Sequence, residues 1–246
     1  MTTAPLVRLA HDRGVAVLTL DSPHNRNALS ARLMDQLSDG LTAAAAEPGT
    51  RAVLLTHTGG TFCAGADLRE AGAAAGPGRL VDLLRLIAGT PTPVVAAVHG
   101  HARAGGLGLI AACDIAVAGP AATFAFTEAR LGLAPAVISL PVLARADPRA
   151  VGRYFLTGET FGPAEAIAMG LVTAPAEALD TILDGLRAGS PQGLAESKAL
   201  TAERLRGALD ERGAAVVEVS ARLFASAEAA EGMRAFLEKR KPSWTP

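Results

Sequence analysis

The sequence predicts an α/β fold whose first part alternates strands with helices and whose last part is helical. Short apolar runs typical of strands recur in the first 118 residues, and stretches of helical character separate them. After about Pro148 the chain has helical character only. Repeated strand–helix units favour a mostly parallel sheet, and 246 residues of which 50% are hydrophobic suffice for a full core.

The N-terminal part predicts a hairpin and then a helix. Residues 6–10 and 15–20 are apolar runs on either side of a turn signal at residues 11–14. Ser30 has the side chain of a helix N-cap, and Leu33, Met34, Leu37 and Leu41 follow it on one helical face. Further strands are expected at residues 51–57, 93–99 and 114–118, with helices at residues 77–88 and 106–112.

The last part of the chain predicts six helices. Pro163 and Pro191 stand where a first-turn proline is tolerated, and Gly170 and Gly189 suit helix ends. The expected helices are residues 149–156, 163–169, 177–187, 191–205, 209–224 and 228–239.

Composition and charge disfavour several classes of protein. A net charge of −1 gives no field that would attract nucleic acid or an anionic membrane. No apolar run is long enough to span a bilayer, and the first five residues lack the pattern of a signal or transit peptide. Cys63 and Cys113 lie in apolar stretches without metal-ligand spacing, which indicates buried, reduced thiols in a cytoplasmic protein.

Two turns of small residues follow predicted strands and are candidates for a site built from main chain. Residues 61–70 follow the strand expected at residues 51–57, and Gly59, Gly60 and Gly65 let the chain reverse or approach a ligand closely. Residues 104–106 follow the strand expected at residues 93–99. Each turn can direct one N–H at an anionic oxygen, although a glycine cluster after a strand is most often a plain turn.

The two turns, in this order and at this separation, resemble those of the crotonase, or enoyl-CoA hydratase/isomerase, family. The resemblance covers nearly the whole chain, through residues 25–30, 62–68, 98–106, 112–114 and 231–242. It implies a ββα spiral core over residues 1–190 and a C-terminal helical region over residues 191–246. The last helices are then expected to cover the active site or meet another subunit of a homotrimer or a dimer of trimers. Residues 71–78 resemble a mobile loop beside the acyl pocket.

The resemblance also implies catalytic residues for an acyl-CoA thioester. The backbone N–H groups of Ala66 and Gly105 would stabilise the thioester oxygen as it becomes negative, aided by the start of a helix. Glu128, which follows a phenylalanine-containing strand, would be the acid/base, with a pKa raised in an apolar pocket. From local sequence alone, Glu128 reads more readily as a surface carboxylate paired with Arg130 or another base, and the family match is what favours the catalytic role.

A second set of residues is expected to bind coenzyme A, which the substrate itself carries, so no separate cofactor is expected. Arg26 and Lys239 would neutralise its phosphates, Lys239 from an adjacent subunit with Phe236 packed nearby. In the family the nucleotide is held largely by backbone, which here corresponds to Ala28, Ala64, Asp67 and Leu68.

One position departs from the family pattern and leaves the reaction open. Ordinary short-chain hydratases carry a second glutamate where this chain has Gly108. Residues 106–114 and 132–139 resemble hydratases of branched enoyl-CoA, of the methylglutaconyl-CoA type, in which Gly108 would make room for a branch. We therefore expect a hydratase that works with Glu128 alone.

Other reactions and a non-catalytic role remain as alternatives. An isomerase that converts 3-enoyl-CoA to 2-enoyl-CoA needs only one glutamate, and a family member that binds acyl-CoA without turnover could also have lost an acid. Thioester hydrolysis and decarboxylation stay open. A dehalogenase is disfavoured because Ala136 stands where its aspartate nucleophile belongs.

Some features admit readings outside this family. Residues 106–111 satisfy a dinucleotide-binding fingerprint, but the preceding strand is expected to end near Val98, too early for it. His99 and His101 read more readily as a strand end and a packing residue than as metal ligands. Ser139 lacks a nucleophile elbow and is expected to cap a helix.

Overall fold

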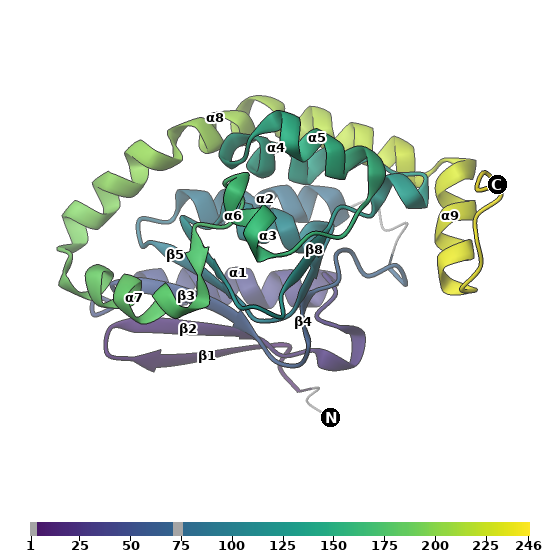
Figure 1. The fold of residues 1–246 in the computed structure, drawn as a ribbon. Coiled ribbons are helices and arrows are strands. Elements are labelled where there is room, and N and C mark those ends of the chain that lie inside the picture. Colours follow the sequence, from purple (N-terminus) through teal and green to yellow (C-terminus); the bar gives the residue numbers. More distant parts are fainter. Residues whose placement is uncertain (1–3, 71–75) are drawn as a thin grey trace.

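A six-stranded sheet forms the base of the protein (Figure 1). The computed structural model describes residues 4–70 and 76–246. The strand order is β1-β2-β3-β5-β7-β9; β1 pairs antiparallel with β2, and the other pairs are parallel. The predicted hairpin and the predicted parallel sheet are therefore confirmed. The strands are β1 Val7–Asp12, β2 Val15–Leu20, β3 Ala52–His57, β5 Val94–Val98, β7 Ile115–Ala118 and β9 Ala174–Pro175.

A second sheet of three parallel strands was not predicted. Its strands are β4 Thr61–Cys63, β6 His101–Arg103 and β8 Thr123–Ala125, in the order β4-β6-β8. Each follows directly on a strand of the large sheet, namely β3, β5 and β7. Three residues are too few to show the alternation that marks a strand in a sequence. With the helices that follow β4 and β6, these pairs form the repeated β-β-α units that the family resemblance implied.

The helices differ from expectation at two places. α8 is one helix of 34 residues where two were predicted, and Gly207 lies inside it. α4 was missed, and Ser139 lies within it, donating from its Oγ to the carbonyl of Ala136 rather than capping a helix. The helices are α1 Ala31–Ala46, α2 Gly76–Gly89, α3 Gly105–Ala112, α4 Ala136–Arg145, α5 Pro148–Thr157, α6 Pro163–Ala168, α7 Leu179–Ala188, α8 Pro191–Phe224 and α9 Ala227–Leu237; the 3-10 turns are η1 Pro23–Asn25, η2 Glu128–Leu131 and η3 Ala176–Ala178.

Most helix ends follow the predicted signals. The Ser30 side chain accepts a hydrogen bond from the N–H of Leu33, as an N-cap does. Pro163 and Pro191 occupy the first turns of α6 and α8, and α7 ends at Gly189. Gly170, with a φ of +84°, reverses the chain just beyond α6. The predicted mobile loop at residues 71–78 lies mostly outside the described residues; its last three residues, 76–78, begin α2.

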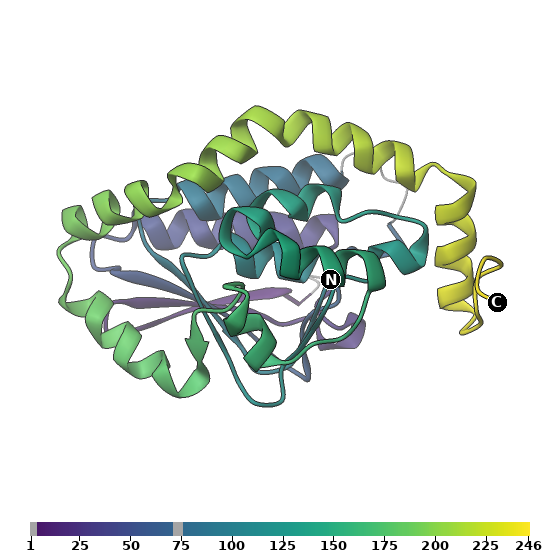
Figure 2. The ribbon, with the colours of Figure 1, turned by 45° about the horizontal axis from the view of Figure 1, so that its top comes forward.

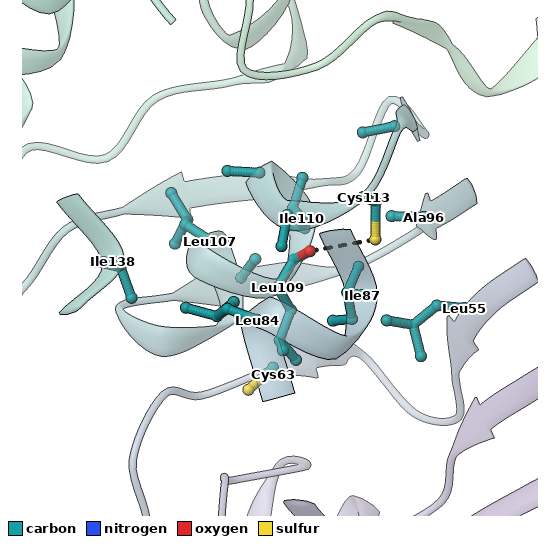
Figure 3. Packing of buried hydrophobic residues seen from close by; sticks show 14 of the residues in the cluster. Leu55, Cys63, Leu84, Ile87, Ala96, Leu107, Leu109, Ile110, Cys113 and Ile138 are labelled. Carbon is teal, nitrogen blue, oxygen red and sulfur yellow. Dashed lines mark hydrogen bonds between the residues drawn. The ribbon is translucent and has the colours of Figure 1, made fainter. Parts of the chain in front are cut away.

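Both cysteines lie in the hydrophobic core (Figure 3), as predicted. Burial raises the pKa of each thiol to about 12, so both stay protonated at neutral pH. Cys113 donates from its Sγ to the carbonyl of Leu109. The same core contains residues from the sheets and from α1 to α6, and Leu205, Leu209 and Val216 of α8 join it.

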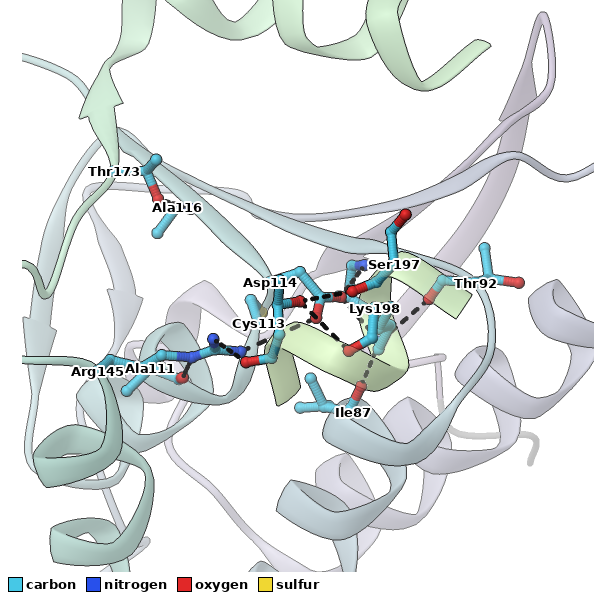
Figure 4. Close-up of polar contacts among 12 residues, drawn as sticks. Ile87, Thr92, Ala111, Cys113, Asp114, Ala116, Arg145, Thr173, Ser197 and Lys198 are labelled. Carbon is cyan, nitrogen blue, oxygen red and sulfur yellow. Dashed lines mark hydrogen bonds and ion pairs between the residues drawn. The ribbon is translucent and has the colours of Figure 1, made fainter. Parts of the chain in front are cut away.

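A buried ion pair fixes the long helix α8 to the sheet (Figure 4). Lys198 Nζ lies 2.8 Å from Asp114 Oδ2 and donates to the carbonyls of Ile87 and Thr92. Asp114 Oδ2 also accepts from the N–H of Val94 at the start of β5. One carboxylate thus joins β5, β7 and α8, and burial lowers the pKa of Lys198.

The last helix stands apart at one end of the molecule. α8 lies across α2 and α4, whereas α9 projects at the side in both views (Figures 1 and 2). α9 packs on η2 and on the end of α8. In residues 4–70 and 76–246, no helix combines the length and the apolar character that crossing a membrane requires.

Lys198→Met should destabilise the protein by about 3–5 kcal/mol, because it leaves the Asp114 carboxylate buried without its ammonium partner. Urea unfolding at pH 7 measures the change. The control is Arg153→Met in the exposed Arg153–Glu159 pair, for which a loss of about 0–1 kcal/mol is expected. Equal losses in the two variants would contradict a structural role for the buried pair.

Candidate functional site

Three chain segments that leave the small sheet at the same edge form the candidate site. In the sheet, Thr61 pairs with His101, and Arg103 pairs with Ala125, all in parallel. Because the strands are parallel, their carboxyl ends lie side by side. The segment after β4 carries Ala66, the segment after β6 carries Gly105, and the segment after β8 carries Glu128. The structure therefore brings the three predicted catalytic residues to one edge.

The turn at Ala66 is held by the segment that precedes α1. The N–H of Leu29 donates to the carbonyl of Gly65, and the N–H of Asp67 donates to the carbonyl of Leu29. This bridge uses the residues on either side of Ala66, so the N–H of Ala66 points away from Leu29. Ala66 is exposed, and no hydrogen bond within the described residues occupies its N–H.

The second turn touches the first. A Cβ on Gly65 would lie 2.8 Å from the Cβ of Ala104 and 3.4 Å from the nitrogen of Gly105, so only glycine fits there. Ala104 has φ +47° and ψ −117°, a conformation costing about 1–3 kcal/mol for a residue with a side chain. Gly105 begins α3, where an N–H has no partner inside the helix, and the described residues supply none.

Glu128 supplies a buried carboxyl group at the same edge of the small sheet. The residue is only 9% exposed, and its Oε2 is buried with no hydrogen-bond partner among the described residues. Burial raises the pKa of Glu128 to about 7, against a weaker opposing effect of its own backbone N–H. The alternative of a surface carboxylate is wrong, because Glu128 is buried, and Arg130 Nε donates to the carbonyl of Thr157.

The segments expected to bind coenzyme A lie next to each other, but much of their backbone is already bonded. The N–H of Ala64 donates to the carbonyl of Arg26, and the N–H of Ala28 to that of Asn25. Asp67 accepts from Asn25 Nδ2 and from the N–H of Arg69. The groups left for a ligand in the described part of the chain include the carbonyl of Ala64 and the N–H of Leu68.

The charged and aromatic candidates lie outside this cluster of turns. Arg26 is exposed and lines a hollow of about 40 Å³, far smaller than the 300–1,000 Å³ typical of ligand pockets. Phe236 is 55% exposed, and Lys239 is exposed at the end of α9. Within one chain, the side chains of Phe236 and Lys239 therefore face solvent.

Gly108 leaves no room for a branched acyl group at this position. A Cβ on Gly108 would lie 2.5 Å from Cγ2 of Ile138, so α4 fills the space that the missing side chain leaves. A Cβ on Gly106 would likewise lie too close to its neighbour, 2.8 Å from the Cβ of Cys63. These two glycines thus let α3 pack closely on α4 and β4. The strand directly before them is β6 (His101–Arg103), so the chain does not leave the sheets at Val98, as the sequence suggested. Nothing in the sequence indicated that Ile138 would lie against Gly108.

The histidines join the two crossovers that lead into the small sheet. The N–H of His99, just after β5, donates to Nε2 of His57, and His101 begins β6 with its N–H on the carbonyl of Gly60. The side chain of His101 bonds to Thr123. In residues 4–70 and 76–246 no group of three or more His, Cys, Asp or Glu side chains is arranged to hold a metal ion.

Two residues that hold the site were missed as functional residues. Asn27 is buried, accepts from the N–H of Ser22, and donates to the carbonyls of Thr58 and Thr61. Leu29 holds the Ala66 turn through its backbone. Both lie in the segment that carried the family resemblance. Their partners are backbone groups of other segments, and a sequence does not show which backbone groups a residue will contact.

The fold and this arrangement agree with the comparison with known families. Residues 10–246 match the enoyl-CoA hydratase/isomerase family, and the chain belongs to it. A crystal structure of an enoyl-CoA hydratase from Mycobacterium avium is similar to this chain, with 50% identity and a TM-score of 0.93, covering 99% of this chain and 100% of that one.

Relatives with more specific names are also similar. A mevalonyl-coenzyme A hydratase of Aspergillus fumigatus is 33% identical over 94% of this chain and 92% of its own length. A carnitinyl-CoA hydratase structure from Mycobacterium avium has 26% identity and a TM-score of 0.87, covering 99% of both chains. Proteins this similar to the chain are thus named for different acyl groups.

Gly108→Ala should destabilise the protein by about 1–3 kcal/mol, because its methyl group would overlap Ile138. In an Ile138→Ala background the same substitution should cost almost nothing or stabilise α3. Urea unfolding of the four proteins measures the coupling. Gly207→Ala in α8, where an added Cβ meets nothing within 4 Å, is the control and should stabilise by about 0.5–1 kcal/mol. Additive effects at positions 108 and 138 would contradict the contact.

Glu128→Gln should stabilise the protein above pH 7 by about 3 kcal/mol. The folded state keeps the Glu128 proton up to about pH 7, whereas the unfolded state releases it near 4.5, so wild-type stability falls as the pH rises between these values. Below pH 4.5 this advantage of the variant should vanish. Urea unfolding at pH 4 and pH 8 tests this, and a stability difference independent of pH would show that the carboxyl group is not desolvated.

Proposed function

We propose that this protein is an enoyl-CoA hydratase that adds water across the 2,3 double bond of an enoyl-CoA thioester. One observation carries the proposal: a buried, unpartnered carboxyl group at Glu128 lies at the same sheet edge as two turns whose N–H groups at Ala66 and Gly105 are unoccupied in the described structure. The names of similar proteins support the same reaction.

The two N–H groups would serve the thioester oxygen. When hydroxide adds to C3, the electron pair of the double bond moves toward C2 and the thioester oxygen becomes negative. Backbone donors already fixed in place stabilise such an oxygen without reorganisation, and losing one donor of this kind costs about 3–4 kcal/mol in comparable sites. The start of α3 adds a partial positive charge on the Gly105 side.

Glu128 would carry out both proton transfers. Its carboxylate takes a proton from water, the water oxygen bonds to C3, and the same carboxyl group then returns the proton to C2 while the thioester carbonyl re-forms. A pKa of about 7 suits this double role, because the group exists in both protonation states near neutral pH. Gly108 packs against Ile138, so no second acid is placed there to share the work.

The isomerase is the second candidate, and the single carboxyl group favours it. One base can remove a proton from C2 of a 3-enoyl-CoA and return it to C4 on the same face. The non-catalytic alternative has less support, because a protein that only binds has no use for a carboxyl group buried without a partner, which costs stability at neutral pH.

Substrate binding and assembly complete the proposal. We expect coenzyme A to use the free backbone groups at Ala64 and Leu68, with Arg26 near its phosphates. Phe236 and Lys239, exposed on one chain, would act on the site of an adjacent subunit in a homotrimer or a dimer of trimers. We also propose a preference for branched acyl groups, whose branch would lie away from Gly108 because Ile138 fills that space. The two buried thiols suit a cytoplasmic protein.

Incubation with 2-enoyl-CoA substrates, among them crotonyl-CoA and 3-methylglutaconyl-CoA, should give a product heavier by one water. Mass spectrometry of this panel, with 3-enoyl-CoA included, measures the outcome. A product of unchanged mass with a moved double bond, and no hydrated species, would establish the isomerase instead. Stoichiometric binding without any product would establish the non-catalytic alternative.

Glu128→Gln should lower kcat by a factor of about 100 or more, because it removes the only proposed acid/base. Coenzyme A binding, measured by calorimetry, should stay unchanged. The control is Glu203→Gln, which neutralises an exposed carboxylate on α8 and should leave turnover as in the wild type. Wild-type rates in the Glu128 variant would remove this residue from the mechanism.

A further inference from the structure

The last helix contacts the Glu128 turn through backbone atoms. Gly232 in α9 is buried, and a Cβ there would lie 2.5 Å from both the carbonyl carbon and the carbonyl oxygen of Leu131, the last residue of η2. Backbone atoms cannot swing aside as a side chain can. The close approach of α9 to η2 therefore requires glycine at position 232.

A second glycine faces the helix from the other side. Gly132, which follows η2, has a φ of +71°, and a Cβ there would lie 2.6 Å from the carbonyl carbon of Glu228 in α9. Ala229, completely buried, lies one turn before Gly232 on the same face of α9. Both segments thus have small residues where they meet, Gly132 on one side and Ala229 and Gly232 on the other.

The contacted turn is the one that carries Glu128. η2 is a single turn, and the N–H groups of Gly132 and Leu133 both donate to the carbonyl of Glu128. A displacement of Leu131 or Gly132 is therefore transmitted to the backbone of Glu128 within a few bonds. The position of the carboxyl group depends on that backbone, since no hydrogen bond in the described residues holds its Oε2.

α9 itself is held by the tail that follows it. Lys239 adopts a φ of +55° and reverses the chain, and Arg240 then donates to both oxygens of Glu231, next to Gly232. The N–H of Ser243 donates to the same carboxylate. These bonds hold the pKa of Glu231 down at about 2. The tail thus closes on α9 at the turn that contacts η2.

We propose that α9 is a positioning element for Glu128, and that the contact of Gly232 with Leu131 keeps the carboxyl group in its buried place. This inference rests on the proposed function. α9 contacts the last residue of η2, Leu131, and Glu128 is the first residue of the same turn. Through this contact, α9 would set both the alignment of the Glu128 carboxyl group and its protonation.

Charged side chains on the elements around η2 do not account for the behaviour of Glu128. Within residues 4–70 and 76–246, burial is the cause that raises its pKa, and no charged side chain there contributes. Loss of the contact should therefore act through exposure to water. The charged residues on η2 and on the packed helices α5 and α9 are Arg130, Arg149, Arg153, Glu228, Glu231 and Arg234.

The test compares Gly232→Ala with Gly207→Ala, which adds the same methyl group to α8 in open space. Carbon-13 NMR of glutamate carboxyl groups, with the Glu128 signal assigned by its loss in Glu128→Gln, measures the pKa directly. In Gly232→Ala the pKa of Glu128 should fall by about one unit or more from its value near 7, because the carboxyl group gains solvent. Gly207→Ala should keep the wild-type pKa.

Kinetics provide the second readout. In Gly232→Ala the rise of kcat/KM with pH should move to lower pH along with the carboxyl pKa, and kcat at pH 8 should fall about tenfold or more, since small misplacements of a catalytic group have large effects. KM should change little. A wild-type pKa and pH profile in a folded Gly232→Ala protein would overturn the proposal.

A measurement on the wild-type protein covers the case in which Gly232→Ala does not fold. By hydrogen exchange, the amides of Gly132 and Leu133 should have the same opening free energy as the amides of α9. This free energy should be lower than that of the amides in the core strands. Exchange of these two amides together with the core, while α9 opens independently, would overturn the proposal. The NMR titration and the exchange measurement need no turnover, so failure of the hydratase assignment is distinguishable from failure of this inference.

Discussion

The parallel register of β4, β6 and β8 is the constraint on which the site depends. Each strand has three residues, and each starts where a strand of the large sheet has just ended, so the large sheet fixes the position of the small one. The crossovers are joined to each other by the N–H of His101 on the carbonyl of Gly60 and by His57 and His99. Since all three strands run in one direction, their ends deliver two backbone donors and one carboxyl group to one edge without any long loop.

Close backbone contact is the means by which these segments reach one another. Gly100 approaches the carbonyl of Gly60, Gly65 approaches Ala104, and Gly106 approaches Cys63, each within a distance that a Cβ would violate. The turn that presents Gly105 contains the strained backbone of Ala104. The hydrophobic core supplies the stability that such a site requires. Main-chain donors held in this way are rigid before any ligand arrives, which is the property that stabilising a transient negative charge demands.

The sequence revealed most of the large sheet and of the helices, because periodicity and end signals such as Ser30, Pro191 and Gly189 act locally. It did not reveal the small sheet, whose strands are shorter than one repeat of the pattern, nor the continuity of α8 through Gly207, which packing on α2 and α4 sustains. The family resemblance identified Ala66, Gly105 and Glu128 as candidates, and the structure brings them to one edge of the small sheet. The burial of Glu128, the filling of the space at Gly108 by Ile138 and the approach of Gly232 to Leu131 depend on residues far apart in the chain, which no local pattern encodes.

The placement of the two cysteines has a practical consequence. Both sulfur atoms are enclosed in the core, and their thiols stay protonated at any pH at which the protein would be handled. Thiolates are the species that react with maleimides and iodoacetamides, so the native chain offers such reagents almost no target. A single cysteine introduced on the outer surface of α9 would carry a fluorophore there selectively, and the movement of that helix could be followed in solution without first removing any native residue.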